Sequence, residues 1–597
     1  VRRVLARCAV KHRRVGEDDV QGPGLAGDAL EEPFEVELVA DVGAGTPRGT
    51  GLVVFRLVSD IGQLLDGSID RVPVATGDGH ERARLDERLG DCPSDSARCP
   101  GDRDREIHVM LGTVVVDLVV PTRGRLCGIY TVPALRSNMD AAPDIDSVAG
   151  ESVVVIGGGF GGLSTACYLA DAGADVTLLE KNEQLGGRAS RLEADGFKFD
   201  MGPSWYLMPD VFERFFGHFG RSPEEYYTLS HLDPHYRVFW KDGDQVDVLP
   251  DMDHNRELFE SYEPGAGDTL DEYLAESKRT YEIGMEHFVY EDRPNLRDYV
   301  DTDVLRYSWG LSLLGKMQGH VEGYFDHPKL QQLMQYTLVF LGGSPTNTPA
   351  LYNLMSHVDF NMGVYYPDGG IGAVVDGIVE LGDELGVEYV TDAEVTAIEG
   401  RYGAFAVDTA GSDSEGGTGG ESGERYLADI VVSNADYAHT EQALLPEKKR
   451  QYTEEYWESR TYAPSAFLLY LGVEGDVPNL EHHTLVLPTE WNQHFDQIFE
   501  EPAWPDDPAY YLCVPSKTDD TVAPEGHSNL FALVPIAPGL EDTPELREEY
   551  REVVLDDIAE NTGEELHDRI VFEETFCVED FADRYNSYQG SALGLAH

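Results

Sequence analysis

The stretch ESVVVIGGGFGGLSTACYLADAGADVTLLEKN, residues 151–182, decides the fold. Its order predicts a buried strand, a glycine-rich turn, a helix and a second strand, because a continuous apolar run is typical of a parallel strand covered on both faces. Gly157, Gly159 and Gly162 stand in the G-x-G-x-x-G spacing. The first glycine permits a tight turn, the second lets the backbone approach a pyrophosphate, and the third lets the helix pack on the strand. The stretch therefore predicts a dinucleotide-binding α/β domain.

Glu180, the last residue of the second predicted strand, supports the same interpretation. An acid at this place accepts hydrogen bonds from the hydroxyl groups of a ribose. The helix after the glycines points unsatisfied N–H groups toward the phosphates. A glycine-rich turn that binds nothing is the alternative, and the strand, the helix and the terminal acid together argue against it.

Two motifs downstream indicate which dinucleotide is bound. LGGRAS (185–190) contains Gly187 and Arg188, and FKFDMGPSW (197–205) contains Gly202. In this order the motifs resemble the FAD-binding half of the flavin amine oxidase and carotenoid desaturase superfamily. The resemblance implies FAD as the cofactor and places Gly187, Arg188 and Gly202 in its cradle. A surface salt bridge is the alternative role for Arg188.

Later segments narrow the family. They occur in family order and are FLGGSPTNTPALYNLMSHVDF (340–360), GVYYPDGGIGAVVDGI (363–378), VVSNADYAHT (431–440), VPSKTDDTVAPEG (514–526) and FADRYNSYQGSALGLAH (581–597). Together they resemble the bacterial and archaeal phytoene desaturases, over 150–597 and not over 1–138. The resemblance implies stepwise, FAD-dependent desaturation of a C40 carotenoid, phytoene towards lycopene, and implies that backbone near Val395 flanks the adenine.

Three other functions stay open at this point. One is a carotenoid 3,4-desaturase of bacterioruberin synthesis, which needs the same cofactor and a similar substrate tunnel. The second is a carotenoid isomerase, which uses reduced flavin without net oxidation. The third is a non-catalytic prenyl-lipid carrier on the same fold, and the intact glycines, Glu180 and Arg188 argue against it because a carrier needs no flavin.

No residue pattern identifies a catalytic side chain or a metal site. The seven cysteines are scattered and form no C-x-x-C pair, so we expect no metal. His320, His327, His357 and His439 are expected to be structural or exposed. Asp359 and Asp368 lie near glycine-rich segments, but nothing distinguishes them from ordinary surface acids. The catalytic residue is therefore left unassigned.

The charge of the chain limits its partners and its environment. Asp and Glu number 110 against 45 Lys and Arg, a formal net charge of −65. Such a field repels polyanions, so we expect no nucleic-acid partner. The acid excess is typical of salt-in halophiles, and no secretory signal or spanning helix is seen. We expect a cytoplasmic protein in peripheral contact with membrane lipid, and the sequence indicates no oligomeric state.

Charge also divides the chain. Residues 1–138 carry a net charge of only −4, and the remainder carries −61.

The predicted fold is α/β, a Rossmann-like FAD-binding domain interleaved with an α+β substrate domain of helices and an antiparallel sheet. The predicted divisions are an extension from upstream translation or disorder (1–138), the FAD-binding domain's first part (139–250), a helical substrate or membrane-facing domain (251–364), the FAD-binding domain's second part (365–440), the sheet part of the substrate domain (441–580) and the start of a C-terminal FAD-binding segment (581–597).

Two further expectations concern the substrate region and the end of the chain. The apolar stretches 305–317 and 333–343 have the periodicity of ordinary buried helices, whereas the resemblance favours a polyene tunnel or a membrane contact. Relative to the family pattern, the sequence ends at His597, before a last glycine-rich segment. We therefore expect a fragment with an incomplete flavin site.

Overall fold

The structure is a computed structural model and describes residues 148–290, 315–411 and 423–596, together with seven strands between residues 36 and 133. The chain divides into two compact units, one of which begins at Val1 and the other at Pro143. Within the first unit the strands form two antiparallel sheets, β1-β2-β3-β4 and β5-β6-β7. Their bounds are β1 Val36–Val42, β2 Gly51–Leu57, β3 Pro73–Thr76, β4 Arg82–Arg84, β5 Arg105–Leu111, β6 Val114–Val120 and β7 Ile129–Pro133. The weak periodicity of 1–138 did not predict these strands; that the segment is upstream translation stays a prediction.

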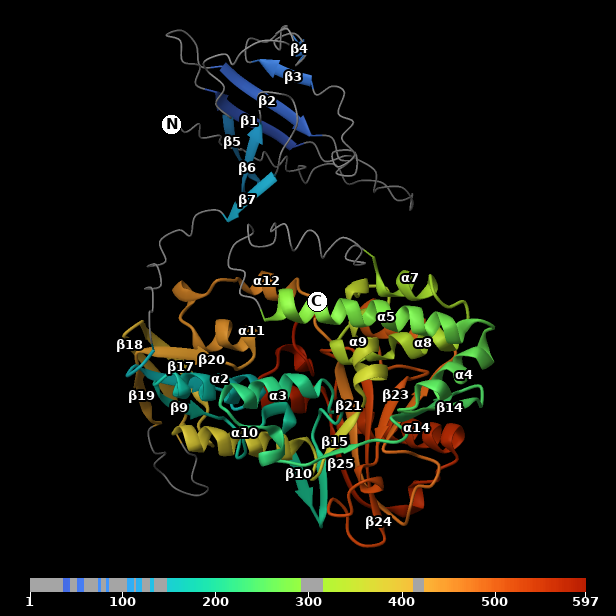
Figure 1. The fold of residues 1–597 in the computed structure, drawn as a ribbon. Coiled ribbons are helices and arrows are strands. Elements are labelled where there is room, and N and C mark those ends of the chain that lie inside the picture. The colour runs from blue at the N-terminus through green and yellow to red at the C-terminus, as the bar shows by residue number, and fades with distance from the viewer. Residues whose placement is uncertain are drawn as a thin grey trace, which may run out of the picture. The chain divides into compact units, whose positions relative to one another are not determined.

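The second unit contains the predicted dinucleotide-binding domain. Its sheet has the order β16-β9-β8-β20, with every neighbouring pair parallel. The strands are β8 Ser152–Ile156, β9 Asp175–Leu179, β16 Glu388–Val390 and β20 Ile430–Ser433. Helix α2, Phe160–Asp171, connects β8 to β9, so residues 151–182 form the strand, turn, helix and strand that the sequence predicts. Figure 1 shows α2 and α10 beside this sheet.

Helix α10, Ile371–Leu385, brings a distant segment to the same sheet. Its predicted apolar face is buried, with Val374, Val375, Ile378 and Leu381 packed in one core with α2, β8 and β9. The carboxylate of Asp200 caps the start of α10, since its oxygens accept hydrogen bonds from the N–H groups of Ile371 (2.9 Å) and Gly372 (3.1 Å). The segment FKFDMGPSW (197–205), which contains Asp200, therefore connects the first and second parts of the predicted FAD-binding domain.

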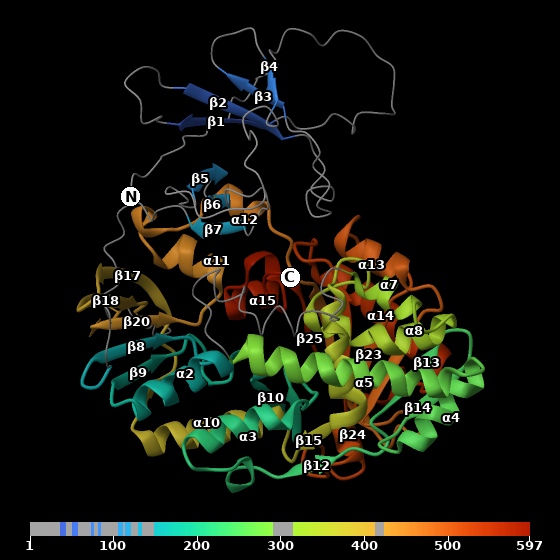
Figure 2. The same ribbon diagram turned by 45° about the horizontal axis from the view of Figure 1, so that its top comes forward.

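A seven-stranded sheet lies in the part of the chain that is predicted to form the substrate domain (Figure 2). Its order is β14-β13-β22-β23-β24-β21-β25, with bounds β13 Tyr236–Trp240, β14 Gln245–Val248, β21 Ser465–Glu474, β22 His483–Leu487, β23 Tyr510–Cys513, β24 His527–Ile536 and β25 Ile570–Phe576. Five pairs are antiparallel as predicted, but β13 and β22 are parallel. A parallel pair needs a long crossover, and the helices between these two strands supply it.

The pairing of β13 and β14 also corrects a boundary. Residues 236–248 were assigned to the first part of the FAD-binding domain, yet they pair with the large sheet. Local sequence patterns do not show this pairing, because the partner strand, β22, lies more than 230 residues away along the chain. The large sheet therefore begins before residue 250, with β13.

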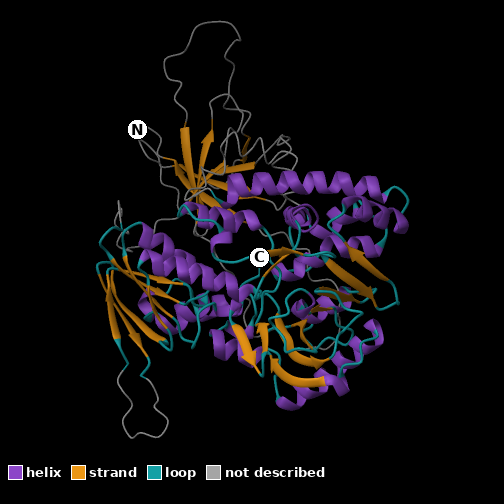
Figure 3. Cartoon of the chain, turned by 60° about the horizontal axis from the view of Figure 1, so that its bottom comes forward, coloured by secondary structure: helices purple, strands orange, loops and turns teal. Residues whose placement is uncertain are grey.

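Helices cover the large sheet, as Figure 3 shows in purple. They are α4 Met252–Tyr262, α5 Ala266–Gly284, α7 Met317–Glu322, α8 Pro328–Gln335, α9 Leu354–His357, α13 Asn492–Phe499 and α14 Pro544–Thr562. The described part of 251–364 is thus helical, as predicted. Residues 305–314 lie outside the described residues, whereas Leu333, Met334 and Leu338 are fully buried in the core. Burial of these three side chains agrees with an ordinary buried segment, and the polyene tunnel or membrane contact stays a prediction.

The remaining elements are short. The strands are β10 Arg191–Ala194, β11 Phe197–Asp200, β12 Leu229–His231, β15 Tyr365–Pro367, β17 Val395–Arg401, β18 Ala404–Thr409 and β19 Arg425–Ala428; the helices are α3 Pro209–His218, α11 Tyr437–His439, α12 Glu454–Glu458 and α15 Val578–Tyr585. The Gly/Ser-rich run 412–422 lies outside the described residues. Within the described part of the chain, no helix is both long and apolar enough to span a membrane.

Candidate dinucleotide site

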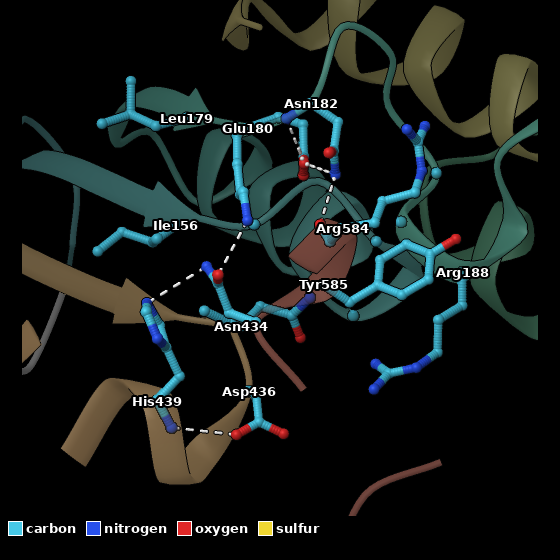
Figure 4. Close-up of a pocket in the computed structure, with 18 of the residues that line it drawn as sticks. Ile156, Leu179, Glu180, Asn182, Arg188, Asn434, Asp436, His439, Arg584 and Tyr585 are labelled. Carbon is cyan, nitrogen blue, oxygen red and sulfur yellow. Dashed lines mark hydrogen bonds between the residues drawn. The ribbon is translucent and has the colours of Figure 1, made fainter. Parts of the chain in front are cut away.

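A pocket of about 320 Å³ opens at the carboxyl ends of β8, β9 and β20. This edge is where α/β sheets bind their ligands. The glycine-rich turn, the end of β9, the segment after β20 and the end of α15 all contribute to its wall. Figure 4 shows the side chains of Glu180, Arg188 and Asn434 around this one pocket.

At each glycine of the fingerprint, a side chain is excluded for a different steric reason. Gly157 has a φ of +96°, a conformation that side chains disfavour. A Cβ on Gly162 would lie 1.9 Å from the carbonyl oxygen of Gly157, so α2 could not pack on the turn. Gly159 is different: a Cβ there would meet no protein atom closer than 3.6 Å. Because Gly159 lines the pocket, its missing side chain keeps open space that a ligand can fill.

Glu180 is buried at the end of β9 and joins two stretches of backbone. Its Oε2 accepts a hydrogen bond from the N–H of Gly158 at 2.6 Å, and its Oε1 accepts one from the N–H of Asn182 at 2.9 Å. Oε1 also accepts a hydrogen bond from Asn182 Nδ2 at 2.9 Å, so three of the about four acceptor positions of a carboxylate are used and one remains for a ribose hydroxyl. The carboxylate is therefore held in place and still has acceptor capacity on the pocket wall.

Among the described residues, Arg188 is one of three Lys and Arg residues that line the pocket, together with Lys181 and Arg584. Its Nη2 donates to the hydroxyl of Ser587 at 3.3 Å, and its guanidinium lies 5.5 Å from the ring centre of Tyr585. Its Nε is buried without a hydrogen-bond partner, and no ion pair is formed between Arg188 and the described carboxylates. Burial lowers the pKa of Arg188, while Asp436 acts against this shift. A buried cation with an unused donor is what an anionic pyrophosphate would satisfy.

The other predicted residues lie close by. Gly187 has a φ of +58°, and a Cβ there would lie 3.1 Å from Cα of Gly159. A Cβ on Gly202 would lie 2.8 Å from the carbonyl oxygen of Arg188, so this glycine supports the pocket without lining it. Val395 is buried and lines the pocket at the start of β17.

Some pocket residues were not singled out from the sequence. Asn434 follows β20, and its N–H donates to the carbonyl of Ile156 at 2.8 Å. A signal was available, since Asn434 lies in the family segment VVSNADYAHT (431–440), directly after strand-forming residues, and ligands bind at strand carboxyl ends. Arg584 and Tyr585 also line the pocket from the end of α15. No spacing rule could have predicted them, because about 400 residues separate them from the glycine turn.

The end of α15 is fixed to the acid-bearing turn. Lys181 donates to Asn586 Oδ1 at 2.9 Å, and Arg584 pairs with Glu183 at 2.9 Å. Asn182 Nδ2 also donates to the carbonyl of Arg584 at 3.2 Å. The last predicted segment, 581–597, therefore joins the cofactor pocket through its first residues.

These features fit FAD. The opening at Gly159, the unused Nε of Arg188 and the acceptor capacity of Glu180 provide space, positive charge and hydrogen-bond acceptors in one pocket. When bound, FAD supplies a two-electron acceptor for hydrogen removed from a substrate. The chain's own residues would bind and orient the cofactor in this pocket.

The candidate acids and histidines have different surroundings. Asp359 is fully buried and accepts a hydrogen bond from the Tyr236 hydroxyl at 2.9 Å, so it is not an ordinary surface acid. Burial raises its pKa to about 7. Asp368 is exposed and accepts a hydrogen bond from Ser230.

The four candidate histidines lie in different places. His439 lies on the pocket wall, 3.3 Å from Asn586 Nδ2, while His357 contacts Asn361 in the helical region. His320 contacts Asn353 and His327 caps α8.

Comparisons with known proteins define the family. The family model described as flavin-containing amine oxidoreductase matches residues 160–594. A carotenoid 3,4-desaturase of Haloarcula japonica is 67% identical over 454 residues, which cover 76% of this chain and 90% of that protein. A zeta-carotene-forming phytoene desaturase of Myxococcus xanthus is 34% identical over 457 residues, 75% of this chain and 85% of that protein. A solved oxidoreductase of Methanosarcina mazei superposes with a TM-score of 0.46 at 16% identity, covering 71% of this chain and 88% of that one.

The chain belongs to the flavin-containing amine oxidoreductases. Within that family it is a carotenoid desaturase of halophilic type, an FAD-dependent oxidoreductase that acts on a carotenoid. The predicted family, fold class, enzyme class and cofactor are thereby confirmed.

Proposed function

We propose that this protein is a carotenoid 3,4-desaturase, which introduces a double bond between carbons 3 and 4 of a carotenoid. The observation that carries the proposal is the 67% identity to the Haloarcula japonica enzyme over 90% of its length. The phytoene desaturase of Myxococcus xanthus is only 34% identical over a similar span. Phytoene desaturation, which the sequence alone favoured, is the second candidate.

The proposal assigns the pocket residues to parts of FAD. Gly157, Gly159 and Gly162 shape the pyrophosphate cradle, and Glu180 accepts hydrogen bonds from the ribose. Gly187, Arg188 and Gly202 continue the cradle toward the flavin, and backbone at Val395 flanks the adenine. The support is that six of these eight residues line one pocket, while Gly162 packs against the carbonyl oxygen of Gly157 and Gly202 packs against that of Arg188.

Peripheral contact with membrane lipid in a halophile's cytoplasm is part of the proposal. A carotenoid offers no charged group, so its binding must rest on burial of apolar surface, at about 0.8 kcal/mol per CH₂. Such a substrate is stored in lipid, which makes a lipid-facing entrance useful. Leu593 and Leu595 are 52% and 37% exposed near the end of the described chain, and they are candidates for this contact. Co-flotation with vesicles in concentrated KCl tests it, and a protein that stays at the bottom of the gradient contradicts it.

The test of the catalytic proposal compares substrates. The protein is incubated with FAD in concentrated KCl and with liposomes that contain either phytoene or a lycopene-type carotenoid. We expect a red-shifted product only from the lycopene-type substrate, identified by chromatography. Conversion of phytoene alone would move the assignment to the phytoene desaturases. A product with unchanged hydrogen content would identify an isomerase and would contradict both.

A further inference from the structure

Three side chains with metal-ligating atoms meet in the core of the large sheet, away from the dinucleotide pocket. One ligand atom each from His482, His483 and Cys513 lies within 4.8 Å of the other two. Their exposed fractions are 4%, 0% and 1%. None of the three lines the dinucleotide pocket. The cluster therefore needs an explanation of its own.

Strand pairing brings the three residues together. β22 and β23 are antiparallel, and His483 lies directly opposite Cys513. Cross-strand partners project from the same face of a sheet, so the imidazole and the thiol are neighbours. His482 precedes β22 by one residue, and its ring centre lies 4.6 Å from that of His483. Because 29 residues separate Cys513 from His483, no short motif in the sequence reveals the cluster.

The hydrogen bonds of the two imidazoles leave one nitrogen of each unused. His482 Nδ1 lies 2.7 Å from the hydroxyl of Thr518, and His483 Nδ1 lies 2.6 Å from the hydroxyl of Tyr511. The Nε2 atoms of both histidines are buried without a hydrogen-bond partner among the described residues. Buried polar atoms are normally satisfied, so two unpaired nitrogens on histidines of this cluster indicate a missing ligand.

This pattern is typical of metal-binding histidines. Such residues usually donate their second ring N–H to an oxygen, which fixes the tautomer and leaves the other nitrogen's lone pair for the metal. Neutral imidazole is the form that ligates metals.

The surroundings hold the rings in place and supply negative charge. The indole of Trp205 stacks on His483 with ring centres 4.1 Å apart and planes 8° from parallel. Tyr366 packs against His482 at 4.7 Å and donates to Asp519 at 3.3 Å. The carboxylate of Asp519 favours positive charge at His482. A cation bound between these residues would therefore find an oriented, partly compensated site.

We propose that His482, His483 and Cys513 bind one zinc ion through two imidazole nitrogens and one thiolate. Nitrogen and sulfur are the ligands that Zn²⁺ prefers, and three protein ligands leave a fourth position for water. On binding, the S–H bond of Cys513 breaks, its proton goes to solvent and a Zn–S bond forms, with no oxidation or reduction. The ion links the start of β22 to the end of β23. The proposal is independent of the carotenoid that the enzyme uses.

The first test needs no variant. Full-length, FAD-loaded protein is stripped with a chelator and titrated with Zn²⁺ and, separately, with Co²⁺ as a spectroscopic probe. We expect one Zn²⁺ per chain after dialysis and, with Co²⁺, a thiolate-to-metal charge-transfer band with the d–d bands of a tetrahedral site. Binding should weaken as pH falls, since a proton is released. Absence of the charge-transfer band at saturating Co²⁺ overturns the proposal.

A matched pair of variants locates the site. Cys167 and Cys513 are both buried free thiols, but only Cys513 belongs to the cluster. Cys513→Ser should lose the charge-transfer band and stoichiometric Zn²⁺ binding, whereas Cys167→Ser should keep both. FAD content and circular dichroism establish that each variant is folded. If Cys513→Ser does not fold, His482→Gln replaces it. Equal binding by the cluster variant and Cys167→Ser contradicts the assignment.

Discussion

The carboxylate of Glu180 accepts a hydrogen bond of 2.6 Å from the backbone N–H of Gly158. The acid at the end of β9 and the turn after β8 are thus one connected unit rather than two separate binding elements. Parallel pairing of β8 with β9 fixes both ends of this bond, so the bond holds the two parts of the pocket wall together. The predictions for the cofactor site follow from this arrangement.

Substitution of Gly159 should remove FAD binding without unfolding the protein. A Cβ at this position meets no protein atom within 3.6 Å, so Gly159→Val points its added atoms into the pocket. We expect the purified variant to lack flavin absorbance while it keeps the wild-type unfolding temperature of the FAD-free protein. Gly217→Ala is the control, since a Cβ there meets nothing within 4 Å and lies outside the pocket. Full flavin content in Gly159→Val would refute the assigned cradle.

Arg188→Gln should weaken FAD binding more than it affects folding. The guanidinium forms no ion pair with the described carboxylates, so its charge is available for an anionic ligand. A charge-assisted hydrogen bond contributes about 1.5–3 kcal/mol, which corresponds to a Kd raised roughly 10- to 100-fold. Flavin fluorescence titration measures it. Arg191→Gln, which breaks an exposed pair with Asp376, is the control and should leave the Kd unchanged.

The cofactor half could be predicted from the sequence because its rules are local. Residues 151–182 carry their own strand, turn and helix signals, and the apolar face of α10 repeats at helical spacing. The predicted site residues come from the same local rules or from the family resemblance. What local rules could not show is the pairing of β13 with β22, which placed residues 236–248 in the other sheet.

The residues that sequence reasoning missed share one property: each contacts residues that lie far away from it along the chain. Asn434, Tyr585 and the cluster of His482, His483 and Cys513 are each assembled by strand pairing or by helix docking. Asp359 could not be separated from more than a hundred other acids until its burial was known. Burial and long-range pairing are set by the tertiary structure, and composition does not show them.

Asp359 should make the protein less stable as pH rises. Burial raises its pKa from 3.8 to about 7, so between these values the folded chain holds a proton that the unfolded chain has lost. The contribution of Asp359 to the free energy of unfolding therefore falls from about pH 4 to about pH 7 and then levels off. Asp359→Asn should remove this dependence, which amounts to about 4 kcal/mol.

The comparison of two variants isolates this effect. Denaturant unfolding at pH 5 and pH 8 should show Asp359→Asn gaining stability relative to wild type as pH rises. Asp368→Asn, which changes an exposed carboxylate, should keep the wild-type pH dependence. Parallel curves for wild type and Asp359→Asn would mean that Asp359 is ionised in the folded protein.

Salt should stabilise the protein strongly. The formal net charge of −65 makes the compact state repel itself at low ionic strength. The Debye length falls from about 10 Å at 0.1 M to about 3 Å at 1 M, so most of this repulsion is screened within that range. We expect Tm to rise steeply between these KCl concentrations and more slowly above them. A Tm that does not depend on KCl would contradict the expectation that repulsion among the acidic groups destabilises the folded protein at low salt.

An anaerobic single-turnover experiment tests the central claim most directly. FAD-loaded protein in concentrated KCl is mixed with a lycopene-type carotenoid in liposomes, and flavin absorbance and polyene products are followed together. If the protein is a carotenoid 3,4-desaturase, one flavin is bleached for each double bond formed, and Gly159→Val shows neither change. Formation of the double bond without bleaching of the flavin, or an unchanged flavin and carotenoid in the FAD-loaded wild type, would contradict the account.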